Sequence, residues 1–89
     1  MQRSVVVAIA EGLHARPAAL FVQAAGQQPA AVTISKDGAD PVPAASILSV
    51  MSLGVAAGQE VVLATESDDA DAAAPLDALE TFLRQVEIA

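Results

Sequence analysis

The only histidine, His14, lies two residues before Arg16 and three before Pro17. A neutral imidazole has a nitrogen lone pair that can attack phosphorus, and a guanidinium can bind phosphoryl oxygens. Because proline is tolerated only in the first turn of a helix, Pro17 predicts that a helix begins close to His14. The first amides of a helix have no acceptor within it and attract anions. The pattern predicts a phosphoryl group held on His14, and the alternative is a histidine that merely caps or turns the chain.

The first half of the chain contains two predicted strands, one helix and one short extended segment. Residues 4–9 are rich in Val and Ile and predict a strand, and residues 31–35 predict a second. Between them, residues 15–25 predict a helix that Gly26 ends. The apolar face of this helix comprises Ala18, Phe21, Val22 and Ala25. A turn at residues 36–38 leads to an extended segment around Val42, which the flanking Pro41 and Pro43 confine to a sheet edge.

The second half predicts a short helix, a strand and a closing helix. Ser46 is a natural N-cap for a helix over residues 46–53, and Gly54 is a natural terminator. Residues 60–64 predict a strand after a turn at Gly58. The closing helix, with Pro75 in its first turn, is expected to run to about residue 88. Its buried stripe is predicted to be Leu76, Leu79, Phe82, Leu83 and Val86. This order suggests helices packed on one face of a small sheet.

Composition limits the possible classes of protein. The 89 residues fit a single domain, 1–89, and the 54% hydrophobic content favours a folded globule. Without cysteine, disulfides and thiolate metal sites are excluded. A net charge of −7 argues against binding to nucleic acid. The longest apolar stretch, residues 44–58, includes three serines and is too short for membrane insertion. The acidic segment Asp68-Asp69-Ala70-Asp71 lacks the spacing of a calcium loop, so we expect it to be a solvated surface rather than a metal site. We also expect no cofactor.

Two segments carry a resemblance to a known family. Gly12-Leu13-His14-Ala15-Arg16-Pro17-Ala18-Ala19 and Ser46-Ile47-Leu48-Ser49-Val50-Met51-Ser52-Leu53-Gly54 resemble HPr, the histidine-phosphorylated carrier of the bacterial sugar phosphotransferase system. The resemblance covers essentially the whole chain. It implies an α+β fold, an open-faced β-sandwich with a four-stranded antiparallel sheet and three helices on one face, in the order βαββαβα.

The resemblance also implies roles for the residues of the first segment. His14 aligns with the histidine that accepts a phosphoryl group on Nδ1 from phosphorylated enzyme I and passes it to sugar-specific enzyme IIA components. Arg16 aligns with the arginine that steadies the phosphoryl group. Gly12, Ala15 and Pro17 form the loop that positions it. On this reading the protein is a cytoplasmic, monomeric phosphocarrier for sugar uptake rather than an enzyme.

A partner-binding surface is implied on the first and second helices. Ala19, Leu48 and Met51 match the family's contact positions, and core packing is the alternative role for these apolar side chains. Many HPr proteins surround the site with lysines, whereas this chain has Gln23, Gly26 and Ser49 there. We therefore expect the electrostatic steering of partners either to be weak or to come almost entirely from Arg16.

Ser46 matches a serine that a dedicated kinase phosphorylates in many Gram-positive bacteria, producing a corepressor that binds a transcriptional regulator. A helix cap is an equally good explanation of this serine. Two alternatives to the general phosphocarrier follow. One is an HPr-like regulatory protein, either a nitrogen-branch carrier or a Ser46-phosphorylated corepressor, although His14 and Arg16 weigh against a purely regulatory role. The other is a small hydrolase using His14, which the absence of a nucleophile-elbow pattern disfavours.

Overall fold

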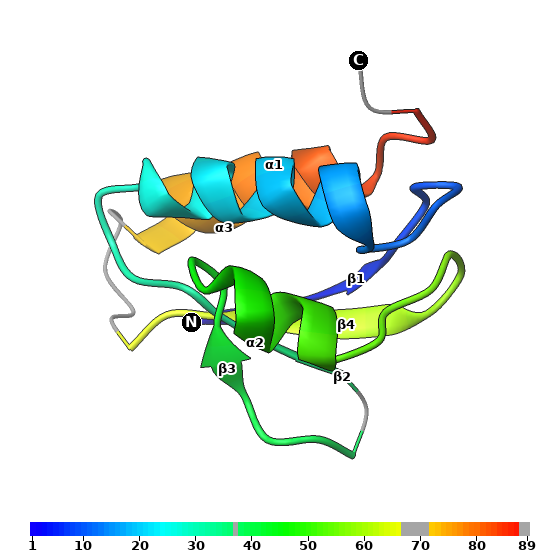
Figure 1. Cartoon of the computed structure of the whole chain (residues 1–89). Coiled ribbons are helices and arrows are strands. Elements are labelled where there is room, and N and C mark those ends of the chain that lie inside the picture. The colour runs from blue at the N-terminus through cyan, green and yellow to red at the C-terminus, as the bar shows by residue number, and fades with distance from the viewer. Residues whose placement is uncertain (37, 67–71, 88–89) are drawn as a thin grey trace.

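The computed structural model describes residues 1–36, 38–66 and 72–87, and Figure 1 shows its course. The elements in chain order are β1 (Gln2–Val6), α1 (Ala15–Gly26), β2 (Thr33–Lys36), β3 (Val42–Pro43), α2 (Ile47–Ser52), β4 (Glu60–Ala64) and α3 (Ala73–Leu83). The order βαββαβα is therefore confirmed for the described part of the chain.

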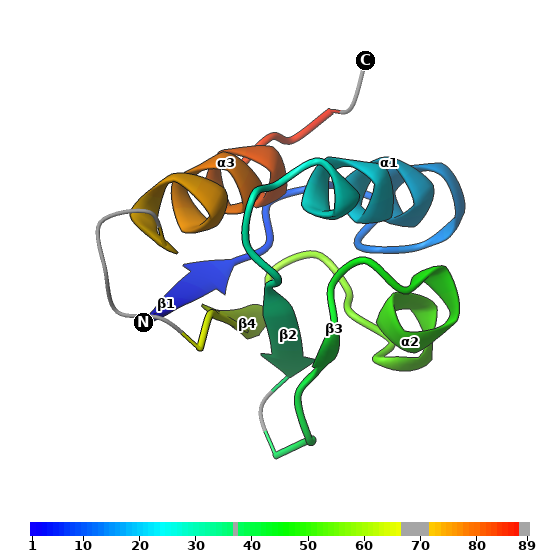
Figure 2. The same cartoon turned by 90° about the vertical axis from the view of Figure 1, so that its left-hand side faces the viewer.

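The strands form one antiparallel sheet in the order β1-β4-β2-β3. Figure 2 shows the strands in this order, with α1 and α3 above them and α2 beside β3. The α+β open-faced sandwich that the family resemblance implied is thus correct. Pro43 lies in the edge strand β3, as its missing amide hydrogen requires.

The core lies between the helices and the covered face of the sheet. Alternate residues of the strands point inward, so Val5, Ile34 and Leu63 are fully buried. On the helical side, the rings of Phe21 and Phe82 lie 5.8 Å apart at an interplanar angle of 56°, a favourable tilted arrangement. This contact fixes α1, whose N-terminal end carries the predicted site, against α3.

The first strand begins and ends earlier than the predicted residues 4–9. β4 pairs with Gln2–Val6, and beyond this ladder the backbone leaves β4. The amide of Ala8 donates to the carbonyl of Leu83 at 2.8 Å, and that of Ala10 donates to the carbonyl of Val86 at 3.0 Å. Val7 and Ile9 are apolar because they belong to the core, not because they extend the strand.

The ends of α1 and α3 also differ from the prediction. Gly26 is the last residue of α1, and the helix is capped by the following Gln27 in a right-handed conformation. α3 ends at Leu83, so Val86 is 62% exposed and is not part of the buried stripe. The carbonyls of Leu83 and Val86 accept from the loop after β1, which replaces the expected helical continuation. Residue 88 lies outside the described residues.

Other predicted helix signals are confirmed. Ser46 caps α2, its hydroxyl oxygen accepting from the amide of Ser49 at 3.4 Å. Gly54 follows α2 with a φ of +64°, the left-handed conformation typical of a glycine after a helix. Pro75 is the third residue of α3 and therefore lies in its first turn.

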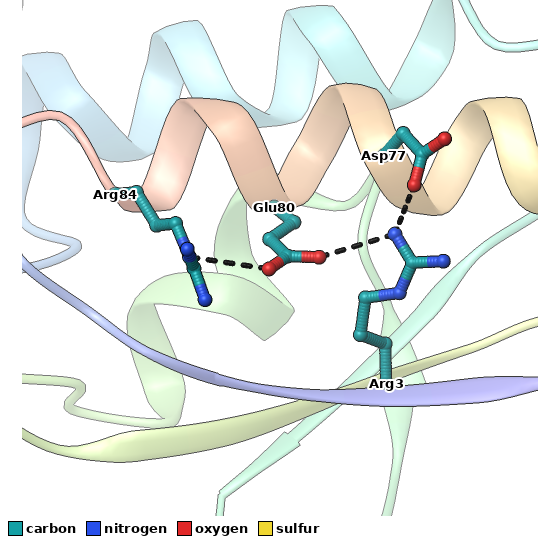
Figure 3. A network of polar contacts seen from close by, with 4 residues as sticks. All are labelled: Arg3, Asp77, Glu80 and Arg84. Carbon is teal, nitrogen blue, oxygen red and sulfur yellow. Dashed lines mark hydrogen bonds and ion pairs between the residues drawn. The ribbon is translucent and has the colours of Figure 1, made fainter.

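An ion-pair network joins the edge strand β1 to α3 (Figure 3). Arg3 Nη1 donates to Asp77 Oδ1 and, at 3.1 Å, to Glu80 Oε1. The second oxygen of Glu80 pairs with Arg84 Nε at 3.1 Å. Two of the four basic residues of the chain are thus paired with carboxylates of α3.

Candidate functional site

His14 is the N-cap residue of α1, with extended backbone angles of φ −120° and ψ 151°. Its side chain is exposed and makes no capping hydrogen bond to α1, all of which lies within the described residues. The imidazole is therefore not committed to the helix that it precedes, which argues against the simple capping role. It is placed where the first amides of a helix favour an anion.

The loop before His14 is held by backbone contacts with the loop after α2. The amide of Leu13 donates to the carbonyl of Val55 at 3.0 Å, and Leu13 and Val55 are both fully buried. Gly12 has a φ of +67° and lies so close that an added Cβ would meet the Val55 oxygen at 2.5 Å. The family resemblance placed Gly12 in the loop around His14, but nothing in the sequence identified Val55 as its contact.

Ala15 adopts a left-handed conformation, with a φ of +46°. It is the one non-glycine residue with positive φ in the described part of the chain. This conformation costs about 1–2 kcal/mol for a residue with a Cβ atom. The turn at Ala15 connects the extended backbone at His14 to the helix, so it sets where the imidazole lies relative to the helix end.

Arg16 and Pro17 lie in the first turn of α1, with Arg16 exposed and Pro17 buried. Pro17 contributes no amide hydrogen, so its burial leaves no unpaired donor. The remaining basic residues lie elsewhere: Arg3 and Arg84 pair with α3, and Lys36 Nζ donates to the carbonyls of Leu53 and Gly54. Arg16 is therefore the cation that the fold brings next to His14.

Three apolar side chains on α2 face solvent. Leu48 is 77% exposed, Met51 is 42% exposed and Ile47 is 37% exposed. The core-packing alternative for Leu48 and Met51 is thus wrong, while Val50 takes the buried position on this helix. Ala19 is exposed on the neighbouring α1. We call Ala19, Ile47, Leu48 and Met51 the apolar face; Ile47 was not singled out from the sequence.

The apolar face leads directly to the His14 loop. α1 and α2 pack against each other. Met51 lies four residues before Val55, whose carbonyl accepts from the amide of Leu13. The loop before α1 and the loop after α2 both lie on the right in Figure 1. A partner that covers α2 therefore also meets the start of α1.

Other features of the described residues do not add to this site. A cavity of about 400 Å³ is lined by Ala30, Ala31, Thr33, Ala64, Thr65 and Glu66, at the end of β4 remote from the Val55 loop. Within residues 1–36, 38–66 and 72–87, no three His, Cys, Asp or Glu side chains gather around a possible metal position. The acidic residues 68–71 lie outside the described residues. None of the described helices has the length and hydropathy needed to cross a membrane.

The chain is similar to proteins of one family over nearly its whole length. A family model described as "PTS HPr component phosphorylation site" matches residues 1–85. A phosphocarrier protein HPr from Haloferax volcanii is 49% identical over 88 residues, which are 98% of this chain and 97% of the relative. An HPr-like protein Crh from Halalkalibacterium halodurans is 40% identical over 85 residues, covering 96% of this chain and 98% of the relative.

A solved structure from the same family has a similar fold. The crystal structure of a phosphocarrier protein HPr from Bacillus anthracis matches with a TM-score of 0.85 and 42% identity, covering 93% of this chain and 95% of that one. Fold and site together define a class of small open-faced sandwiches that present a histidine at a helix N-terminus. Within that class, the chain belongs to the HPr family of phosphocarriers of the phosphotransferase system.

Proposed function

We propose that this protein is a general phosphocarrier in which His14 accepts a phosphoryl group from phosphorylated enzyme I and passes it to enzyme IIA components for sugar uptake. The observation that carries the proposal is the exposed imidazole of His14, which makes no capping hydrogen bond and lies close to Arg16 at the N-terminus of α1. The protein acts as a cytoplasmic, monomeric intermediate of a relay rather than as an enzyme with its own turnover.

The chemistry requires little from the carrier beyond placement. An unprotonated imidazole nitrogen of His14, Nδ1 in the family, forms a bond to phosphorus while the nitrogen–phosphorus bond of the donor histidine breaks. The attacking nitrogen carries no proton, so no general base is needed. Arg16 and the helix N-terminus offset the charge of the phosphoryl oxygens, and Gly12, Ala15 and Pro17 fix the position of the loop. In the second transfer His14 is the donor: its bond to phosphorus breaks while a bond forms to the acceptor in the enzyme IIA component.

Exposure is necessary because two different partners must reach the same nitrogen. The apolar face is suited to binding a protein partner, because the cores of protein interfaces are depleted in charged residues and enriched in apolar contacts. We propose that Ala19, Leu48 and Met51, together with Ile47, are covered by enzyme I and then by an enzyme IIA component.

A regulatory role through Ser46 is the second candidate, and the similarity to an HPr-like protein Crh favours it. Ser46 is half-buried, and its hydroxyl accepts from Ser49, so the cap alone accounts for the serine. In this alternative, a serine kinase modifies Ser46 and a transcriptional regulator binds the product. Such a role can coexist with phosphoryl transfer at His14.

The test is phosphorylation by phosphoenolpyruvate and purified enzyme I. We expect one phosphoryl group per chain that is lost in acid, as a phosphoramidate is, whereas a serine phosphate would survive. His14→Ala should abolish the labelling, and Ser46→Ala should retain it. Labelling that persists in His14→Ala would falsify the site. Arg16→Ala should remain folded and slow the transfer by about tenfold or more, because it removes a charged donor from the transferring group.

A further inference from the structure

We propose that Lys36 and Gln59 are positioning residues for His14, acting through residues 53–56. This inference depends on the proposed function for its kinetic consequence, but its structural part can be tested separately. Neither side chain is part of the His14 loop. Both lie close to the paired ends of the two central strands, since Lys36 is opposite Val61 in the β2–β4 ladder and Gln59 precedes β4.

Lys36 holds the end of α2. Its Nζ donates to the carbonyl of Leu53 at 3.3 Å and to that of Gly54 at 3.1 Å. The last carbonyls of a helix have no amide partner within it and carry partial negative charge, so an ammonium is well matched to them. The cation thus ties the segment after α2 to the end of β2.

Gln59 holds the other end of the same segment. Its Oε1 accepts from the amide of Ala56 at 2.8 Å, while its own amide donates to the carbonyl of Ala56 at 3.2 Å. The carbonyl of Gln59 in turn accepts from the amide of Val7 at 2.9 Å. Residues 53–56 are therefore held by a side chain at each end. Lys36 is the last residue of β2, and Gln59 directly precedes β4.

Residues 53–56 are also the backing of the His14 loop. Val55 accepts from the amide of Leu13, the residue before His14, at 3.0 Å. An added Cβ on Gly12 would meet the Val55 oxygen at 2.5 Å and the Ala56 Cα at 2.9 Å. With the two backbones in contact, a displacement of residues 53–56 must shift the His14 loop. Group transfer is sensitive to shifts on the order of 1 Å at the reacting atoms, so the two side chains influence the reaction without touching it.

The experiment compares Lys36→Met with Lys36→Arg, which keeps the cation, and with Arg84→Met. The last variant removes the same charge from a side chain that pairs with Glu80 on α3. The first measurement is amide hydrogen exchange at Leu13, with Leu63 on the central strand β4 as the reference for global opening. We expect Lys36→Met to speed exchange at Leu13 at least about threefold relative to Leu63, and Arg84→Met to leave the ratio unchanged.

The second measurement is the single-turnover rate of phosphoryl transfer from enzyme I. We expect Lys36→Met to lower this rate about fivefold or more, Lys36→Arg to restore most of it, and Arg84→Met to match the wild type. An unchanged Leu13 exchange ratio in Lys36→Met would overturn the inference, as would a normal transfer rate. If the wild type accepts no phosphoryl group, the proposed function fails, while the exchange ratio still decides whether Lys36 orders the loop.

Gln59 provides an independent pair of variants. Gln59→Leu removes the acceptor for the amide of Ala56, and Gln59→Glu keeps an oxygen at that position. We expect faster exchange at Leu13 and slower transfer for Gln59→Leu, with Gln59→Glu close to the wild type. Should Lys36→Met fail to fold, this pair decides, and equal exchange ratios in the two variants would count against the inference.

Discussion

The carbonyl oxygen of Val55 lies where a side chain at Gly12 would begin, only 2.5 Å from the position of a Cβ atom. The loop after α2 and the loop before α1 therefore touch backbone to backbone. The contact also requires the left-handed φ of +67° at Gly12. One glycine satisfies both conditions, and this explains why the segment before the histidine contains it.

Gly12→Ala should destabilise the protein more than Gly38→Ala. Both glycines have positive φ, but an added Cβ on Gly38 meets nothing within 4 Å. The control therefore carries the cost of the conformation alone, about 1–2 kcal/mol, whereas Gly12→Ala adds a steric clash and should cost about 2–4 kcal/mol in total. Urea denaturation of the two variants measures the difference, and equal losses would contradict the close contact.

Ala15→Gly should stabilise the fold. Removing the Cβ relieves about 1–2 kcal/mol at the left-handed conformation, while the greater freedom of glycine in the unfolded chain costs about 0.4–1 kcal/mol. The expected net gain in the free energy of unfolding is about 0.5–1 kcal/mol. Thermal or urea unfolding checks this, with Ala24→Gly in the last turn of α1 as a control that should instead lose up to about 1 kcal/mol. A loss in both variants would indicate that Ala15 is not left-handed.

Leu48→Ala should weaken partner binding without loss of stability. Leu48 is 77% exposed, so truncation changes the free energy of unfolding by less than about 0.5 kcal/mol. If enzyme I covers this side chain, the efficiency of phosphoryl transfer should fall about three- to tenfold at low carrier concentration. Val6→Ala is the matched control, because Val6 is 54% exposed on β1 and lies outside the apolar face. Equal transfer by both variants would remove Leu48 from the docking surface.

Arg3→Met should lower the free energy of unfolding, and the loss should shrink as salt is added. The hydrogen bond with Asp77, aided by that with Glu80, raises the pKa of Arg3. A raised pKa stabilises the folded protein wherever the arginine is protonated, and this contribution is lost only as the pH rises through strongly alkaline values. The Arg3 contribution should therefore be constant between neutral and moderately alkaline pH. Urea denaturation at two salt concentrations and two pH values tests both statements.

The helix at the site could be predicted from local chemistry because Pro17 restricts where it begins. Ser46 and Gly54 mark the ends of α2 for similar local reasons. The left-handed Ala15 could not be predicted, since alanine disfavours that conformation and no residue type in the segment signals it. The exposure of Leu48 was equally undetermined, because a six-residue helix has too few positions to define its buried side from periodicity.

The boundaries that were wrong depend on distant partners. β1 ends where pairing with β4 ends, although the Val- and Ile-rich run continues. α3 ends where the carbonyls of Leu83 and Val86 accept from the loop after β1. Residues 83–86 are more than 70 positions away from that loop in the sequence, so no local pattern could report the contact.

Pro43 in β3 and Pro41 just before it have a consequence for behaviour at high concentration. Pro43 offers no amide hydrogen to a further strand, and Pro41 restricts the backbone just before Val42. A strand from another molecule could not pair regularly along this edge of the sheet, because one of the amide donors is missing. This edge of the sheet is thus protected from fibril-like stacking, a property suited to a phosphocarrier that must bind other proteins and dissociate from them.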